Sequence, residues 1–258
     1  MCRYFVIVDD IWSTDAWELV KSALPENNLN SRIIATTRII NVATSCCSSL
    51  EGYVHNIKPL SNQHSQKLFF KRVFGDTSAC PPHLEEISHG ILEKCHGLPL
   101  AIISIASLLA GKSNMNRWEE VYSSLCSAFS HQGMRDILLL NYYDLPHHLK
   151  TCLLYLSMYP EDYEIEREEL IWRWIAEGFI TEVKGQTADQ VAENYFNELA
   201  NRSLIQPIDI QYDGRAKGCR VHDMVLDLIV SLSAEENFVS IVEGQSYNGG
   251  GHKIRRLS

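Results

Sequence analysis

The 258-residue sequence lacks the features of a secreted or membrane protein. It has eight cysteines but no C-x-x-C pair, and Cys95-His96 has no second pair at zinc-site spacing. We therefore expect reduced, buried thiols of the kind found in cytosolic proteins. Two aspartates interrupt the N-terminal apolar run, so no signal peptide is predicted. The longest apolar run, Leu98 to Ala110, has thirteen residues, whereas a spanning helix needs roughly 20, which predicts a cytoplasmic protein without membrane insertion.

The sequence also has little positive charge. Its formal net charge is −9, and residues 161–198 supply most of it, with eleven acidic side chains against Arg167, Arg173 and Lys184. An acidic surface repels the phosphate backbone of nucleic acids, which proteins bind through lysine and arginine. We therefore predict no nucleic-acid partner.

A complete phosphate-binding loop, G-x-x-x-x-G-K-[ST], is missing. Gly111-Lys112-Ser113 comes one glycine short of that pattern, because Ala106 stands where the first glycine belongs. An apolar helix is expected directly before Gly111, whereas the loop should follow a strand. Gly111 is therefore better interpreted as the residue that ends this helix.

An apolar run that ends in two carboxylates is the most informative feature present. Tyr4 to Val8 is short and rich in β-branched residues, which predicts a strand covered on both faces. Asp9 and Asp10 follow at once, and carboxylates of this kind hold hydrated Mg²⁺ beside a nucleoside triphosphate. Aspartate also ends strands without any such role, so this stretch alone leaves both interpretations open.

A second strand is predicted from Ser31 to Arg38, and it too ends in polar side chains. If the two strands are parallel, Thr36, Thr37 and Arg38 lie at the same sheet edge as the two aspartates. Open α/β sheets bind their ligands at that edge.

The remainder of the chain is predicted to be mainly helical. A third strand, Tyr53 to Leu60, leads into a helix capped by Ser61 and stopped by Gly75. A domain boundary is expected between Asp76 and Pro82. Further helices are predicted over residues 15–24, 84–95, 98–110 and 118–129, followed by two that are broken at Pro146.

Two amphipathic helices, Arg167 to Ile180 and Asp189 to Asn201, precede a predicted hairpin. Helices followed by a hairpin are typical of a winged helix. After the hairpin, His222 and Asp223 begin a helix whose free N–H groups suit an anion such as a phosphate. Taken alone, the motif favours the plainer interpretation, in which Asp223 is an ordinary N-cap and His222 a turn residue.

Five motifs in order resemble the NB-ARC region of plant NLR disease-resistance proteins, over nearly the whole chain. They are residues 6–12 (VIVDDIW), 31–38 (SRIIATTR), 97–101 (GLPLA), 152–162 (CLLYLSMYPED) and 221–223 (VHD). Trp12 and the fourth motif are similar to the coiled-coil class. The implied fold is α/β plus α. It comprises a remnant of a P-loop NTPase parallel sheet (1–76), a helical subdomain (77–132), a winged-helix subdomain (133–233) and a linker (234–258).

The resemblance implies an ADP/ATP-dependent switch in pathogen perception, with Mg²⁺ at the sheet edge. By position, Asp9 matches the Mg²⁺-binding acid and Asp10 the catalytic acid that orients a hydrolytic water. Arg38, next to Thr37, matches the arginine that detects the γ-phosphate.

The same resemblance places cofactor-binding residues in the later motifs. Leu98 and Pro99 lie in the loop that packs on adenine, and His222 matches the histidine that contacts the β-phosphate of ADP. Val221 departs from the methionine usual before that histidine but stays apolar.

The missing phosphate-binding loop is the serious departure. The resemblance implies that its strand lies between the two predicted strands, so we expect this chain alone to bind nucleotide weakly and to be inactive as an ATPase. We also expect a fragment of a larger receptor. Its partners would be the missing phosphate loop, a coiled coil, leucine-rich repeats and other receptor copies in an NLR oligomer.

Two alternatives come from other classes. A winged-helix DNA-binding or interaction module fits residues 136–230, but the candidate recognition helix, Asp189 to Asn201, carries three acids and no lysine or arginine. A working NTPase would need the missing loop and its lysine to position the phosphates.

Overall fold

The computed structural model describes residues 3–25, 29–47, 52–75, 80–112, 114–128 and 133–238. The chain divides into two compact units, Met1–Lys58 and Pro59–Ser258. The expectations for Ser113 and for the linker at 239–258 lie outside the described residues. The α/β plus α fold class is confirmed, with a small parallel sheet and a winged helix.

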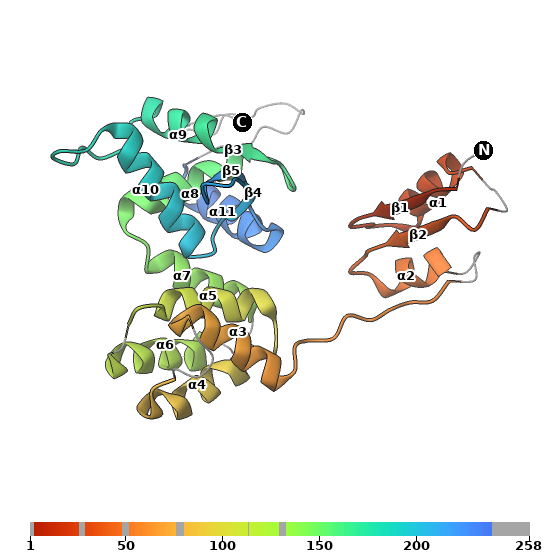
Figure 1. Ribbon diagram of the computed structural model, residues 1–258. Helices are drawn as coiled ribbons and strands as arrows, with labels where there is room; N and C mark the ends of the chain where they lie inside the picture. The colour runs from red at the N-terminus through yellow and green to blue at the C-terminus, as the bar shows by residue number, and fades with distance from the viewer. Residues whose placement is uncertain are drawn as a thin grey trace. The chain divides into compact units, whose positions relative to one another are not determined.

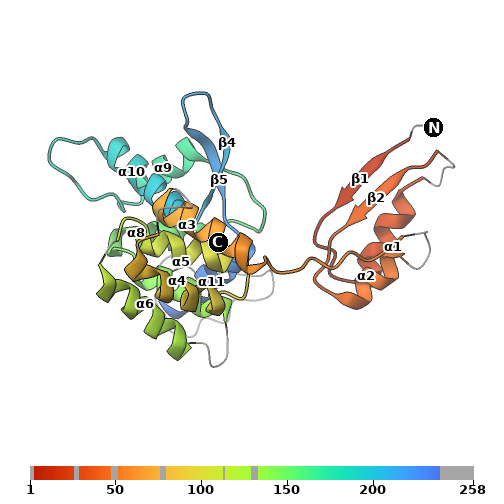
Figure 2. The same ribbon diagram turned by 60° about the horizontal axis from the view of Figure 1, so that its bottom comes forward.

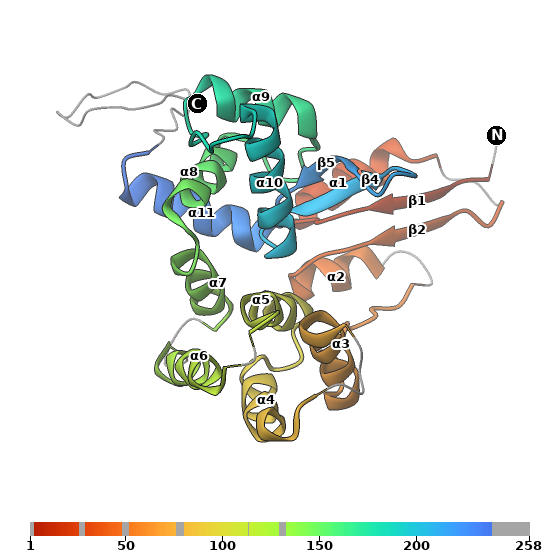
Figure 3. The ribbon, with the colours of Figure 1, turned by 60° about the vertical axis from the view of Figure 1, so that its left-hand side comes forward.

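The first unit is a two-stranded parallel sheet with two helices. Strand β1 (Phe5–Val8) pairs with β2 (Arg32–Ala35), and the register runs from Phe5 opposite Arg32 to Val8 opposite Ala35. The strands run side by side in Figure 3. Helices α1 (Thr14–Ala23) and α2 (Ile40–Cys47) complete the unit. Its core is the cluster of Ile11, Trp17 and Val42, packed against Val8 and Ile33.

Only one face of this sheet is covered. Successive side chains of a strand point to opposite faces, and here Val8 and Ile33 meet the core while Phe5 and Ile7 are each 63% exposed. The expectation of a strand buried on both faces is therefore wrong for this unit. In this chain β1 and β2 are hydrogen-bonded neighbours, so no gap is left between them where the missing strand was expected.

Extended chain leads from the first unit into the helical bundle of the second. Residues 53–60 form no strand, contrary to expectation, because Tyr53 and Ile57 are more than 80% exposed and their backbone pairs with no strand among the described residues. Helix α3 (Asn62–Phe74) follows, and both of its expected caps are present: the Ser61 side chain at the N-terminus and Gly75 in the left-handed conformation at the C-terminus.

The bundle is built from α3 and the next four helices, which appear at the bottom of Figure 1. They are α4 (Pro82–Lys94), α5 (Pro99–Leu109), α6 (Met115–Ala128) and α7 (Met134–Tyr143). Phe69 and Trp118 meet edge to face at 5.9 Å in its core. Because α3 packs on α5, the compact unit starts at Pro59, ahead of the expected boundary at residue 76.

The rest of this unit is the winged helix. It contains α8 (His147–Tyr155), a 3₁₀ turn (Leu156–Met158), α9 (Arg167–Ala176), α10 (Ala188–Asn201) and α11 (Asp223–Glu235). Its antiparallel sheet has the order β3 (Ile165–Glu166), β5 (Ala216–Arg220) and β4 (Gln206–Ile210). The β4–β5 hairpin, blue in Figure 2, is the wing. None of the described helices is long and apolar enough to cross a bilayer.

Candidate functional site

The ends of the two parallel strands form one continuous edge. Beyond the strands, the Thr36 N–H donates to the Val8 carbonyl at 3.0 Å and the Ile11 N–H donates to the Thr36 carbonyl at 2.9 Å. The ladder is thus extended by one step past each strand. Asp9 and Asp10 therefore lie directly opposite Thr36, as the sequence predicted for parallel strands.

The Thr36 hydroxyl fixes both aspartates. It donates a hydrogen bond to Asp9 Oδ1 and accepts one from the Asp10 N–H at 2.9 Å. Asp10 itself has a φ of +53°, in the left-handed region that costs most residues about 1 kcal/mol or more. The chain therefore turns sharply at Asp10, so that the two consecutive carboxylates do not alternate as they would along a strand.

Arg38 completes the edge. Its Nη2 lies 3.1 Å from Asp10 Oδ2, and its guanidinium carbon stands 4.3 Å from the centroid of the Trp12 ring. The Thr37 hydroxyl donates to the Ile11 carbonyl at 2.6 Å and accepts from the Ile39 N–H at 3.1 Å. The Arg38 side chain is 47% exposed and that of Asp10 is 28% exposed, so the pair lies at the surface where a ligand can reach it.

The residues at this edge fit a hydrated Mg²⁺. Mg²⁺ takes one or two carboxylates and completes its shell with water and substrate phosphates. Asp9 is exposed and keeps one oxygen, Oδ2, beyond the bond that Thr36 Oγ1 donates to Oδ1. The described residues contain no cluster of three or more His, Cys, Asp or Glu side chains, so a site made by protein ligands alone is not supported there.

The glycine-proline motif forms a tight turn at the start of α5. Gly97 has a φ of +70°, and its carbonyl accepts from the Leu60 N–H at 2.9 Å. Pro99 is the first residue of the helix, where its missing N–H removes no intrahelical hydrogen bond. Leu98 stands at the N-cap and is 41% exposed. The turn thus presents an apolar side chain to solvent, as a contact for a flat ring would require.

His222 occupies the N-cap of α11. Its Nδ1 accepts from the Met224 N–H at 3.3 Å, and its carbonyl accepts from Val225 and Leu226. The expectation that Asp223 is the cap is therefore wrong, because Asp223 is the first residue inside the helix. The ring and the carbonyl of His222 thus accept the N–H groups of Met224, Val225 and Leu226 at this helix start.

The structure brings four of the predicted site residues together in the first unit: Asp9, Asp10, Thr37 and Arg38. The other three, Leu98, Pro99 and His222, belong to the second unit. Two contacts at this edge were not predicted from the sequence. One is the bond from Thr36 to Asp9, signalled only by a threonine at the strand end, and the other is the stacking of Arg38 on Trp12.

Two family models match this chain. Residues 1–79 match the NB-ARC domain, and residues 158–229 match the winged helix domain of disease resistance proteins. The chain belongs to the NB-ARC disease resistance proteins. These matches cover the sheet edge with both of its motifs and the start of α11 with His222.

Relatives of this NB-ARC chain are plant disease resistance proteins. Disease resistance protein RGA5 of Oryza sativa subsp. japonica is 40% identical over 99% of this chain and 24% of its own length. Disease resistance protein RPM1 of Arabidopsis thaliana is 35% identical over 95% of this chain and 27% of its own length. The chain thus spans about a quarter of the length of these relatives.

A solved structure supports the NB-ARC fold. A Signal Transduction ATPase with Numerous Domains (STAND) protein from Pyrococcus horikoshii, which carries a tetratricopeptide repeat sensor, aligns with a TM-score of 0.52. The alignment covers 90% of this chain and 28% of that protein at 18% identity, so it shows the fold alone.

Proposed function

We propose that this chain is part of an ADP/ATP-dependent switch in an intracellular plant immune receptor. The observation that carries the proposal is the edge formed by Asp9, Asp10 and Arg38, where two carboxylates and one arginine converge at the ends of parallel strands. Such an edge is where α/β sheets bind ligands. The family match and the plant disease-resistance relatives supply the biological setting.

Each side chain at this edge has a distinct role in the proposal. Asp9 holds Mg²⁺, whose charge offsets that of the phosphates. Arg38 is paired with Asp10 in the structure at 3.1 Å, and it turns to the γ-phosphate when ATP is present. A guanidinium that exchanges a carboxylate for a phosphate distinguishes ATP from ADP without any large rearrangement of the sheet.

The second unit contributes the contacts that favour ADP. The exposed Leu98 and the rigid Pro99 provide an apolar surface for adenine. The start of α11 is the positive end of a helix dipole, which attracts a phosphate, and His222 adds a donor at its Nε2 when Nδ1 accepts from Met224. A phosphate contact of this kind would link the nucleotide state to the winged helix.

Nucleotide binding by the chain alone is expected to be weak, because phosphates are positioned mainly by the loop and lysine that this sequence lacks. Calorimetry of residues 1–258 with ADP and Mg²⁺ measures this directly. Low-micromolar affinity would contradict the expectation and would assign binding to the residues present.

The switch itself is testable in a chimera in which residues 1–258 replace the matched region of rice RGA5. Asp9→Asn should abolish the gain in ATP affinity that Mg²⁺ confers while leaving affinity in EDTA unchanged, since only the metal ligand is lost. Glu169→Gln, on the exposed surface of α9, is the matched carboxylate control. An Mg²⁺ effect that persists in the Asp9 variant would refute the assigned role.

A DNA-binding role receives no support from the winged helix. Acidic side chains occur along the length of α10. Two of them, Glu193 and Glu198, pair with arginines of the winged helix itself. Docking that helix in a groove would place acidic side chains against phosphates, with no lysine or arginine on the helix to contact them.

A further inference from the structure

The second unit contains two separate apolar cores that share one helix. The helical bundle is packed around Phe69, Leu84 and Trp118, and the winged helix around a different set of buried residues. Helix α7 belongs to both, because Ile137 packs into the first core and its neighbour Leu138 into the second. In Figure 1 this helix lies between the two groups.

Three polar contacts in the seam beside α7 converge on three consecutive residues at the end of α10. Arg72 of α3 donates to the Asn201 carbonyl at 2.6 Å and to the Ser203 hydroxyl at 3.0 Å. Asn141 of α7 donates to the Arg202 carbonyl at 3.1 Å. Carbonyls at a helix C-terminus carry partial negative charge, so the Arg72 contact is charge-assisted. Water can replace these polar contacts on opening.

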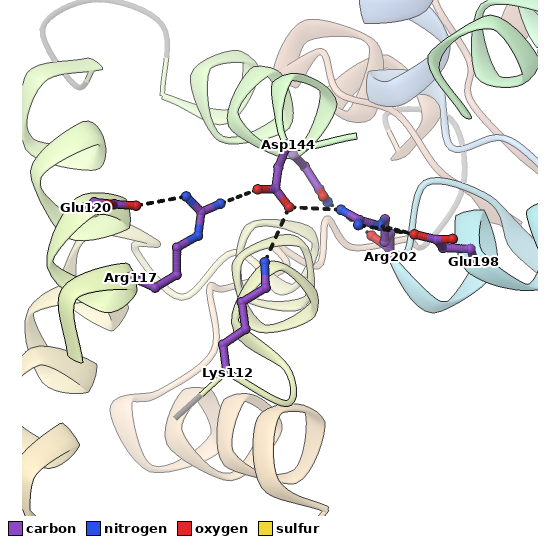
Figure 4. Close-up of polar contacts among 7 residues, drawn as sticks. Lys112, Arg117, Glu120, Asp144, Glu198 and Arg202 are labelled. Carbon is purple, nitrogen blue, oxygen red and sulfur yellow. Dashed lines mark hydrogen bonds and ion pairs between the residues drawn. The ribbon is translucent and has the colours of Figure 1, made fainter. Parts of the chain in front are cut away.

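Asp144 is the centre of the charged part of this seam, as Figure 4 shows. Its carboxylate forms ion pairs with Lys112, at 3.4 Å, and with Arg117, both from the bundle. It also pairs with Arg202 of α10 at 3.0 Å. The Asp144 side chain is 20% exposed, so solvent screens these pairs less than pairs at the open surface. One carboxylate thus connects cations from both sides.

The other two acids of the cluster do not connect the two sides. Glu120 pairs with Arg117 within α6, and Glu198 pairs with Arg202 within α10. The bundle side therefore carries one net positive charge, from Lys112 and Arg117 against Glu120. On α10, Glu198 offsets Arg202, so the negative charge that attracts the bundle cations is that of Asp144, at the end of the shared helix α7. Without the Asp144 charge, those cations face a neutral pair on α10 and the attraction is gone.

We propose that Asp144 is the positioning residue of an electrostatic latch, which holds the winged helix on the helical bundle and opens when its charge is neutralised or screened. The latch makes the relative position of the two halves depend on charge as well as on the apolar burial of α7 in both cores. It is independent of the nucleotide proposal, because it uses neither the sheet edge nor His222.

Hydrogen exchange in residues 198–206 measures the latch in the full chain. In the wild type, raising NaCl from 0.05 to 1 M should accelerate exchange there several-fold, because the Debye length falls from over 10 Å to about 3 Å. Asp144→Asn should exchange as fast at low salt as the wild type at high salt, and should lose its salt dependence.

Two further variants separate charge from packing. Adding Arg202→Met to Asp144→Asn leaves Glu198 as a net negative charge on the winged-helix side, so it should restore part of the salt dependence. Glu169→Gln, which removes an exposed carboxylate paired within α9, should behave as the wild type.

The proposal is overturned if Asp144→Asn keeps slow, salt-dependent exchange in residues 198–206. It is also overturned if exchange in the Asp144→Asn variant rises equally throughout α8 and α11, because that result means unfolding of the winged helix instead of opening of a seam. A double variant that shows no recovery of salt dependence would likewise remove the charge argument.

Discussion

At the scale of single residues, the backbone conformation at Gly97 and the close approach of Leu60 require a glycine at this position of the motif. Its φ is +70°, and a Cβ there would lie 2.4 Å from the Leu60 carbonyl oxygen. Gly97→Ala should therefore lower the free energy of unfolding by about 2–4 kcal/mol, combining backbone strain with the clash. Urea denaturation of the chain measures it.

Gly111 is the matched control for this substitution. It has the same φ of +70°, but an added Cβ meets nothing within 4 Å. Gly111→Ala should therefore cost only the strain of the left-handed conformation, about 1 kcal/mol. Equal losses for the two variants would show that the contact with Leu60 contributes nothing.

Buried thiols give the protein a pH dependence in the alkaline range. Burial raises the pKa of Cys95, Cys152 and Cys219 to about 12, from an ordinary value of 9.0. The unfolded chain then loses these protons first, so stability is complete below pH 9 and falls as the pH rises toward 12. Unfolding midpoints between pH 8 and 10.5 should decline less steeply in Cys219→Ala. If the unfolding midpoint fell equally steeply with pH in the wild type and in Cys219→Ala, a contribution of this thiol to the pH dependence would be excluded.

At the scale of elements, His222 is predicted to stabilise α11 through its ring nitrogen. His222→Ala removes the acceptor for the Met224 N–H and should cost about 1 kcal/mol, whereas His222→Asn keeps a capping oxygen and should recover most of it. Hydrogen exchange at Met224 reports the cap. Equal protection in both variants would mean that the imidazole does not cap the helix.

Several elements were predictable because their end signals are local. Ser61 and Gly75 bound α3, and Thr187 begins α10 with a capping box that involves Gln190. Helix α2 was missed, because its sequence, INVATSCC, is rich in residues with low helix propensity and its formation depends on the burial of Val42. The false strand at residues 53–60 had the composition of a strand but lacks a partner to pair with among the described residues.

The candidate site was predictable only in part, for reasons of sequence distance. The ends of two strands expected to be parallel placed Asp9, Asp10 and Arg38 at one edge, and their contacts confirm that juxtaposition. Their chemical roles stay predictions. The Asp144 cluster joins Lys112 to Arg202 across 90 residues of sequence. No local sequence pattern predicts such a pairing, because each member resembles an ordinary surface charge.

At the scale of the whole molecule, the two units of the chain are proposed to respond to different signals. The first unit carries the sheet edge proposed to sense Mg²⁺ and the γ-phosphate. The second unit carries an apolar turn, a capped helix start and two cores joined by a charged seam. Both family matches fall on the segments that hold the proposed phosphate contacts.

The most direct test of the central claim is the ratio of dissociation constants for Mg²⁺·ATP and Mg²⁺·ADP, measured by calorimetry in the RGA5 chimera and its Arg38→Ala variant. Loss of a charged hydrogen bond to the γ-phosphate is worth about 1.5–3 kcal/mol. The account therefore predicts that relative affinity for ATP falls about 10- to 100-fold, while Arg173→Ala, at an exposed pair on α9, leaves it unchanged. An unaltered ratio in the Arg38 variant would contradict the claim that this sheet edge distinguishes the two nucleotides.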